Sequence, residues 1–391
     1  MNAGSIDSTF NGQRLKIARL YRNLSISELA DNIGIKKQSI SQFENGLTKP
    51  KVETEILLVR ELGFPRNFFY QNTVVPEVNK TFFRSLSSAS ALDKKTQETK
   101  TQLIVEIYNF LCEYLGLPEL DLPELDTFNL SIEDVARELR SYWELGEKPI
   151  PNMVNLIENK GIIVSAFDVE SEKIDAFTQV HDLKNYPQYC VVVGNNKKSA
   201  VRRNFDMAHE LGHIILHSAV ENIDELTQEQ LRKIEDEANL FAAAFLMPKE
   251  AFLRDLVAPT SLVSYVALKE KWHVSISAML IRAKTLNAID NKQYQSLMKS
   301  MSYRKWRTKE PLDDKLVVPV PTLFSSAIEI LFENNIMTPQ TFVYNLSKYG
   351  LSINPHDIEK LLALKEGILK IDMQPIINIK KVISIKKEDY F

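Results

Sequence analysis

The sequence predicts an α+β protein that is predominantly helical. Apolar residues recur at helical spacing through most of the 391 residues, and β-branched runs typical of strands are concentrated in residues 162–193. Hydrophobic residues make up 44% of the chain and charged residues 25%, as in globular proteins with several domains. We expect an all-helical amino-terminal unit, a central unit with a small sheet and a helical carboxy-terminal region.

The composition also argues against a membrane protein. No apolar run approaches the ~18 residues of a membrane-spanning helix, and the polar start Met1–Phe10 does not resemble a signal peptide. The two cysteines, Cys112 and Cys190, lack the spacing of a metal or redox pair and are typical of buried thiols in a reducing compartment. We therefore predict a cytoplasmic protein with no membrane partner.

Residues 27–46 predict two short helices joined by a tight turn at Gly34. The apolar positions that would form the core between them are Leu29, Ala30, Ile33, Ile35, Ile40 and Phe43. Residues 11–51 carry eight Lys or Arg against three acidic residues, a local charge of +5 in a chain of net charge −3. This local charge favours a polyanion as the partner of the region.

This segment, with the tail Glu44-Asn45-Gly46 and then Pro50, resembles the XRE (Cro/repressor) helix-turn-helix family. The resemblance implies a DNA-binding domain over residues 8–70, whose second helix lies in the major groove of double-stranded DNA. The candidate base-reading residues open that helix: Lys37, Gln38, Ser39 and Gln42. A module used only for protein docking is the alternative, because one copy per chain binds DNA weakly unless the protein forms a homodimer.

Residues 71–126 are predicted to form a linker and one long helix, Asp93–Leu115, with an apolar face. That face packs within the chain or pairs with its copy in a dimer. Residues 127–258 are predicted to form the central unit, which opens near the N-cap Ser131. Its candidate strands are residues 162–167, 175–180 and 189–193, with the Cys190–Val193 run as an inner strand. Such a sheet would offer a free edge to an extended peptide substrate.

The most specific motif is His209-Glu210-Leu211-Gly212-His213. Two histidines four residues apart project from one face of a helix, so both Nε2 atoms can bind one zinc ion. Glu210 between them is the candidate general base for the water that attacks a carbonyl carbon. Gly212 is unfavourable inside a helix and predicts a close approach by another element. Histidines on an ordinary amphipathic helix are the alternative interpretation.

A catalytic zinc site needs three protein ligands, and the third is expected on the next helix, residues 234–247. Glu237 shares a helical face with Phe241, and Glu235 shares one with Ala238, so spacing leaves both carboxylates open. His217, one turn beyond His213, is interpreted as a neighbour of the site. The candidates for stabilising an oxyanion are Tyr189, His181 and His217.

The segment A-H-E-L-G-H-x-x-L-H at 208–217, followed by E-A-N-x-F-A-A-x-x-L-M-P at 237–248, is similar to the ImmA/IrrE family of zinc metallopeptidases. The resemblance implies a zincin-like fold in which His209, His213 and Glu237 hold Zn²⁺ and Glu210 is the catalytic base. Similar proteins cleave a specific transcriptional repressor, so the resemblance also implies a protein substrate of that kind.

Two further segments complete the chain. Residues 259–312 contain a stretch at Trp272 similar to one that follows the peptidase core in the same family, which implies a helix-turn-helix-like extension. Residues 313–391 are predicted to be mainly helical, with Thr338-Pro339 and Asn354-Pro355 as helix starts and 376–386 as a terminal strand.

The sequence leaves two classes of function. In the first, the protein is a DNA-binding regulator with a zinc endopeptidase domain that cleaves a partner repressor. In the second, it is a non-catalytic DNA-binding repressor or antitoxin-like regulator whose metallopeptidase-like domain senses a ligand or partner. Glu210 favours the enzyme, because a purely structural zinc site needs no base between its ligands. A general protease is disfavoured, because neither a secretion signal nor a pro-segment is expected to restrain it.

Overall fold

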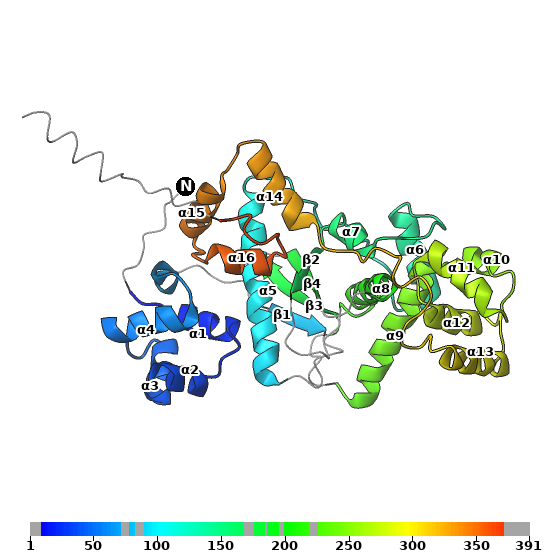
Figure 1. Ribbon diagram of the computed structural model, residues 1–391, viewed down its shortest axis with the longest axis horizontal. Coiled ribbons are helices and arrows are strands. Elements are labelled where there is room, and N and C mark those ends of the chain that lie inside the picture. Colours follow the sequence, from blue (N-terminus) through cyan, green and yellow to red (C-terminus); the bar gives the residue numbers. More distant parts are fainter. Residues whose placement is uncertain are drawn as a thin grey trace, which may run out of the picture.

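The computed structural model describes residues 9–71, 78–82, 90–167, 176–183, 186–194, 199–218, 220 and 226–370 (Figure 1). Helices predominate around one sheet, which confirms the predicted α+β class. The sheet lies at the centre and separates two hydrophobic cores. No helix in the described part of the chain is both long and apolar enough to cross a membrane.

The amino-terminal residues form a small helical bundle (Figure 1, blue). Its elements are α1 (Gly12–Tyr21), α2 (Ile26–Ile33), α3 (Lys37–Glu44), α4 (Val52–Leu62) and the 3-10 turn η1 (Arg66–Tyr70). A capping box of Ser25 and Glu28 begins α2, and Gly34 ends it with a φ of 70°, in the left-handed region. Gly12 lets α1 approach α3 closely, because a Cβ there would collide with the carbonyl oxygen of Phe43. The predicted helix, turn and helix are therefore confirmed.

The described strands form one sheet in the order β1-β3-β4-β2. They are β1 (Val78–Phe82), β2 (Ile163–Phe167), β3 (Ala176–Leu183) and β4 (Tyr186–Gly194). The last three confirm the predicted strands, with Cys190–Val193 in an inner strand as expected. The sequence pattern does not predict β1, which comes from the expected linker and pairs antiparallel with β3. β1 covers the outer edge of β3, and the edge strands of the described sheet are β1 and β2, so binding of a peptide at a free edge stays a prediction.

One face of the sheet packs against α8 (Ala200–Leu216) and forms the α8-side core. The helices around it are α6 (Ile132–Tyr142), α7 (Met153–Glu158), α9 (Gln228–Leu246), α10 (Lys249–Asp255), α11 (Leu262–Trp272), α12 (Ile276–Thr285) and α13 (Asn291–Tyr303). Ser131 caps α6 as predicted. The buried members of this core run from Val135 to Met301, so the predicted segments 127–258 and 259–312 share one hydrophobic core.

The opposite face of the sheet contributes Phe177, Cys190 and Val192 to the α5-side core, together with α5 (Ala91–Cys112). The carboxy-terminal helices complete it: α14 (Leu323–Glu333), α15 (Pro339–Tyr349) and α16 (Pro355–Leu361). Both predicted Pro-initiated helices are thereby confirmed. The same core includes helix-turn-helix residues from Leu15 to Phe69, so the long helix at 93–115 packs within the chain. The expected strand at 376–386 lies outside the described residues.

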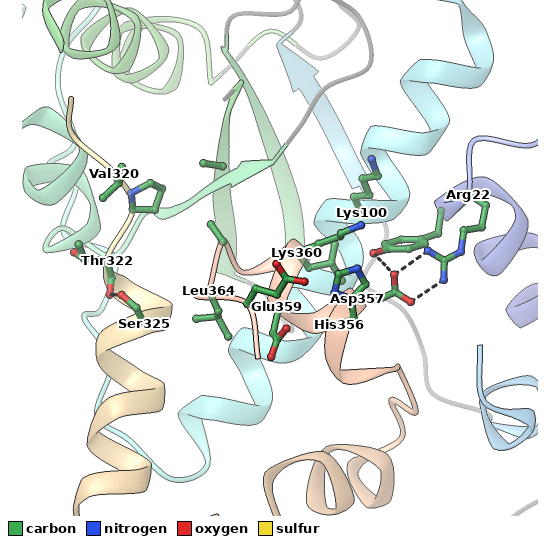
Figure 2. A pocket seen from close by; sticks show the side chains of 16 residues that line it. Arg22, Lys100, Val320, Thr322, Ser325, His356, Asp357, Glu359, Lys360 and Leu364 are labelled. Carbon is green, nitrogen blue, oxygen red and sulfur yellow. Dashed lines mark hydrogen bonds and ion pairs between the residues drawn. The ribbon is translucent and has the colours of Figure 1, made fainter. Parts of the chain in front are cut away.

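Polar contacts also join the amino-terminal bundle to the carboxy-terminal helices (Figure 2). Arg22 donates from Nη1 and Nη2 to the two carboxylate oxygens of Asp357, at 2.8 and 2.7 Å, and the Tyr21 hydroxyl donates to the same carboxylate at 3.2 Å. A cavity of about 760 Å³ opens beside this contact, between α1, α5, β2, α14 and α16. The helix-turn-helix is therefore fixed to the rest of the molecule by both apolar and charged contacts.

Candidate metal centre and DNA-binding surface

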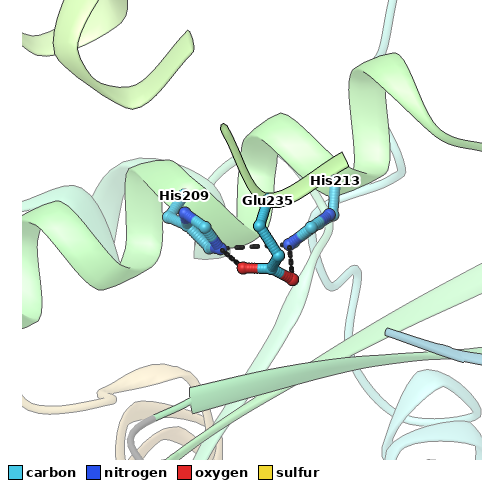
Figure 3. Close-up of side chains that lie close together, drawn as sticks. All are labelled: His209, His213 and Glu235. Atoms are coloured by element: carbon cyan, nitrogen blue, oxygen red, sulfur yellow. Dashed lines mark hydrogen bonds and ion pairs between the residues drawn. The ribbon is translucent and has the colours of Figure 1, made fainter. Parts of the chain in front are cut away.

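The histidine motif lies in the middle of α8, on buried turns of the helix (Figure 3). His209 and His213 project from the same face, and their Nε2 atoms lie 3.0 Å apart. Both side chains are almost fully buried, with relative exposures of 6% and 2%. Two imidazole nitrogens that converge in a buried site are suited to binding one cation.

The carboxylate that completes the group belongs to Glu235 of α9 (Figure 3). Its oxygens lie 3.4 Å from Nε2 of His209 and 3.5 Å from Nε2 of His213. Ligands about 2.0 Å from a tetrahedral zinc ion would lie about 3.3 Å from one another. The two imidazole nitrogens lie 3.0 Å apart, and each has a different Glu235 oxygen within 3.5 Å, so the donor set suits a zinc ion in chemistry and in approximate size.

Glu237, the third ligand implied by the resemblance, lies elsewhere on α9. Its Oε2 accepts a hydrogen bond from Nε2 of His217 at 3.1 Å, and Nδ1 of His217 lies 3.1 Å from Nδ1 of His213. If Nε2 of His213 is left bare for a metal, its Nδ1–H donates to His217, whose Nε2–H donates to Glu237. This chain of neutral tautomers holds the His213 ring in the orientation for metal binding. His217 thus lies beside the three-residue group, as the sequence suggests.

The other histidine is held by Asn239, and the two helices that carry the group are in close contact. Nδ1 of His209 lies 3.0 Å from Oδ1 of Asn239, so the ring donates there and leaves Nε2 free. A Cβ on Gly212 would lie 3.1 Å from a ring carbon of Phe241 and 3.2 Å from the backbone of Ala238. The close approach predicted at Gly212 is therefore the crossing of α8 with α9.

Glu210 points toward the sheet and not into the triangle of donors. Its Oε2 accepts a hydrogen bond from the Thr178 hydroxyl of β3 at 2.6 Å. Burial raises the pKa of Glu210 to about 7, and the charge of His209 and the hydrogen bond from Thr178 act in the opposite direction. A carboxyl group with a pKa near neutrality can both accept and return a proton, which is what a general base requires.

The three candidate oxyanion donors lie in different places. His181 and Thr178 are three residues apart on β3, so their side chains lie on opposite faces and His181 faces away from α8. His217 is engaged by His213 and Glu237. Tyr189 belongs to the α8-side core, on the face of the sheet that carries Thr178. Of the three candidates, only Tyr189 has a hydroxyl group and belongs to the α8-side core. His181 faces the other side of the sheet, and His217 is already hydrogen-bonded.

Comparison with protein families now assigns both units. Residues 157–284 match the model of the IrrE N-terminal-like domain, a metallopeptidase family, and residues 15–69 match that of the helix-turn-helix. The chain joins an XRE-type helix-turn-helix to an IrrE/ImmA-like domain. No curated protein matches the chain.

A cleft of about 800 Å³ lies between α8, α9 and α12 of the IrrE-like domain, beside the histidine group. Asn239, which holds His209, lines its near end. Apolar side chains line much of the rest, namely Phe205, Leu240, Ile281 and Trp306, and Leu240 and Ile281 are exposed. Asn239 is thus the residue that links this cleft to the histidine group.

The helix-turn-helix presents its predicted DNA-reading residues on one exposed surface. Lys37, Gln38 and Gln42 are exposed on α3, and Ser39 is half-buried. A buried ion pair fixes α3 against α1: Arg19 donates to both oxygens of Glu44, at 2.6 and 2.9 Å. The exposed face of α3 is therefore held rigidly, as a helix that enters the major groove must be.

Proposed function

We propose that the protein is a DNA-binding transcriptional regulator that also acts as a zinc-dependent endopeptidase on one partner protein, a repressor. The observation that carries the proposal is the buried group of His209, His213 and Glu235, whose donor atoms all lie within 4.8 Å of one another. Glu210, the candidate base, follows His209 directly on the same helix. A structural zinc site would have no use for that carboxylate.

In this proposal Glu235 is the third zinc ligand, in place of Glu237. A zinc ion bound to these residues would polarise the peptide carbonyl and acidify a water molecule. Asn239, His217 and Glu237 orient the two imidazoles. Thr178 holds the Glu210 carboxylate, which takes a proton from the attacking water and delivers it to the leaving amine.

DNA binding is assigned to the exposed face of α3. Lys37, Gln38, Ser39 and Gln42 are the proposed base-reading residues, and a homodimer would let two such helices read two half-sites. Because both the operator and a repressor substrate would be found on DNA, we infer a cytoplasmic location.

The test compares the wild type with Glu210→Gln, which keeps the size and hydrogen-bonding capacity of the side chain. Each protein is purified, its zinc content is measured, and it is incubated with the product of a neighbouring regulatory gene. We expect equal zinc content and cleavage by the wild type alone. Cleavage by both proteins would remove Glu210 from the mechanism.

A second function is favoured by the cavity of about 760 Å³ beside the Arg22–Asp357 contact. Its walls combine the helix-turn-helix with the carboxy-terminal helices, which suits a regulator that senses a small molecule without cleaving a substrate. In the experiment above, bound zinc without cleavage by either protein would favour this alternative.

A further inference from the structure

The β3 edge lies next to the catalytic machinery of the proposed peptidase. Thr178 of β3 donates its hydroxyl to Glu210, and the backbone of Thr178 pairs with that of Phe82 in β1. Paired strands lie about 4.8 Å apart, so β1 runs one strand spacing from the residue that holds the candidate base. The other edge of β3 is occupied by β4, an inner strand. An extended peptide that added to β3 would therefore occupy the position of β1 (Figure 1).

Of the three described strand pairings, β1–β3 is the one with an irregular register. β1 has five residues against eight in β3, and its register shifts between Val78 and Lys80. Its sequence, Val-Asn-Lys-Thr-Phe, includes Asn and Lys, which are poor strand formers. β3 and β4, by contrast, pair without a register shift from Ala176 to Leu183. A second strand of better sequence can compete for such an edge.

We propose that the β3 edge is the substrate-binding edge and that β1 is its resident, inhibitory occupant. The substrate is then an extended segment that binds antiparallel to β3 through backbone hydrogen bonds. It gains access only when β1 leaves. This proposal rests on the proposed function and adds to it the class of substrate and the restraint on the site. β1 lies between the helix-turn-helix and α5 in the sequence. Displacement of β1 would therefore also move the segment of chain to which the DNA-binding unit is attached.

The first experiment measures binding of a labelled peptide with the sequence of residues 76–85, by fluorescence anisotropy, in the Glu210→Gln background. In an antiparallel pair, the backbone N–H groups of successive residues point alternately toward and away from the partner strand. Proline has no backbone N–H, so the double substitution Lys80→Pro with Thr81→Pro removes one hydrogen-bond donor to β3 whichever of the two residues points that way. Lys80→Ala with Thr81→Ala is the matched control, since it keeps both N–H groups. We expect the proline variant to bind the peptide at least about 10-fold more tightly than the control does. Equal affinities in folded proteins would overturn the proposal.

A second variant covers the case in which the prolines prevent folding. Lys80 and Val180 are direct Cα partners, and opposed residues of an antiparallel pair lie about 4.5–5.5 Å apart, within disulfide range. Lys80→Cys with Val180→Cys, in a Cys112→Ser background, should crosslink on oxidation and lose peptide binding, and reduction should restore it. Failure to crosslink, or equal binding in both redox states, would contradict the proposal. Neither experiment needs hydrolysis, so a negative result here leaves the peptidase assignment standing.

Discussion

The two faces of the central sheet treat their buried polar groups differently. On the α8 side, the ring nitrogens of His209, His213 and His217 each lie close to another polar atom of the site. On the α5 side, neither ring nitrogen of the fully buried His181 has a hydrogen-bond partner in the described chain. Two nitrogens of Arg14 and one oxygen of Glu106 are also unpartnered there, although these side chains form an ion pair at 3.3 Å.

This difference separates a face built for chemistry from a face built for attachment. Unpartnered buried polar atoms are costly, and a fully connected network is rigid. The three histidines of the α8 side are joined by such a network of contacts. The helix-turn-helix is attached through the α5-side core, next to the buried Arg14–Glu106 ion pair.

The largest effect is expected when the proposed zinc ligand Glu235 is removed from the α8 side. Glu235→Ala should weaken zinc binding by more than 100-fold, because residues that only orient a ligand typically account for about 10- to 100-fold. Glu237→Ala removes the last member of the hydrogen-bonded series His213–His217–Glu237, so its loss of zinc affinity should fall within that 10- to 100-fold range. Competition with a chelator of known affinity measures both, with Asp236→Ala as the control on the same helix. The reverse order would restore Glu237 as the ligand.

The next largest effect concerns the ion pair that fixes α3. Glu44→Ala leaves the buried Arg19 without its partner, and breaking a buried pair typically costs about 3–5 kcal/mol. We expect a lower thermal midpoint and weaker DNA binding, with unchanged zinc content because the α8 side is not involved. Arg254→Ala is the control: it removes an ion pair whose two side chains are 65% and 49% exposed, and should leave the thermal midpoint nearly unchanged. Similar losses in both variants would contradict a special role for the Arg19–Glu44 pair.

How far the sequence predicted this molecule depends on the range of each interaction. The helix-turn-helix, the helix that carries His209 and His213, and three strands follow from local periodicity and are confirmed. β1 was missed because a short polar strand is stabilised by its partner 100 residues away, which no local pattern reveals. Glu235 and Glu237 lie about 200° apart around α9, so the crossing of α9 over Gly212 decides which of them meets the histidines. Glu235 and Asn239 are one turn apart on the same face of α9, and this spacing could have indicated that Glu235 is the carboxylate that faces the histidines.

His181 offers a smaller effect with a defined dependence on pH. Burial lowers its pKa to about 4 from an ordinary value of 6.5, so the unfolded chain binds this proton first as the pH falls. The protein should therefore lose stability between about pH 6.5 and pH 4, by up to about 3 kcal/mol from this group, and no further below pH 4. His181→Leu should flatten that part of the curve of unfolding free energy against pH. An unchanged slope would mean that His181 finds a partner in the folded protein.

The smallest effect is expected at the exposed face of α3, where a contact to one base is lost and nothing else changes. Gln42→Ala should weaken binding to the specific operator by about 1–3 kcal/mol, because glutamine can bond adenine through two hydrogen bonds. Binding to unrelated DNA should stay the same, since phosphate contacts carry it. A duplex from the region upstream of the gene serves as the probe, and Lys233→Ala, exposed on α9, is the control. A uniform loss on all sequences would show that Gln42 contacts the backbone, and no loss on any sequence would favour a helix-turn-helix used for protein docking.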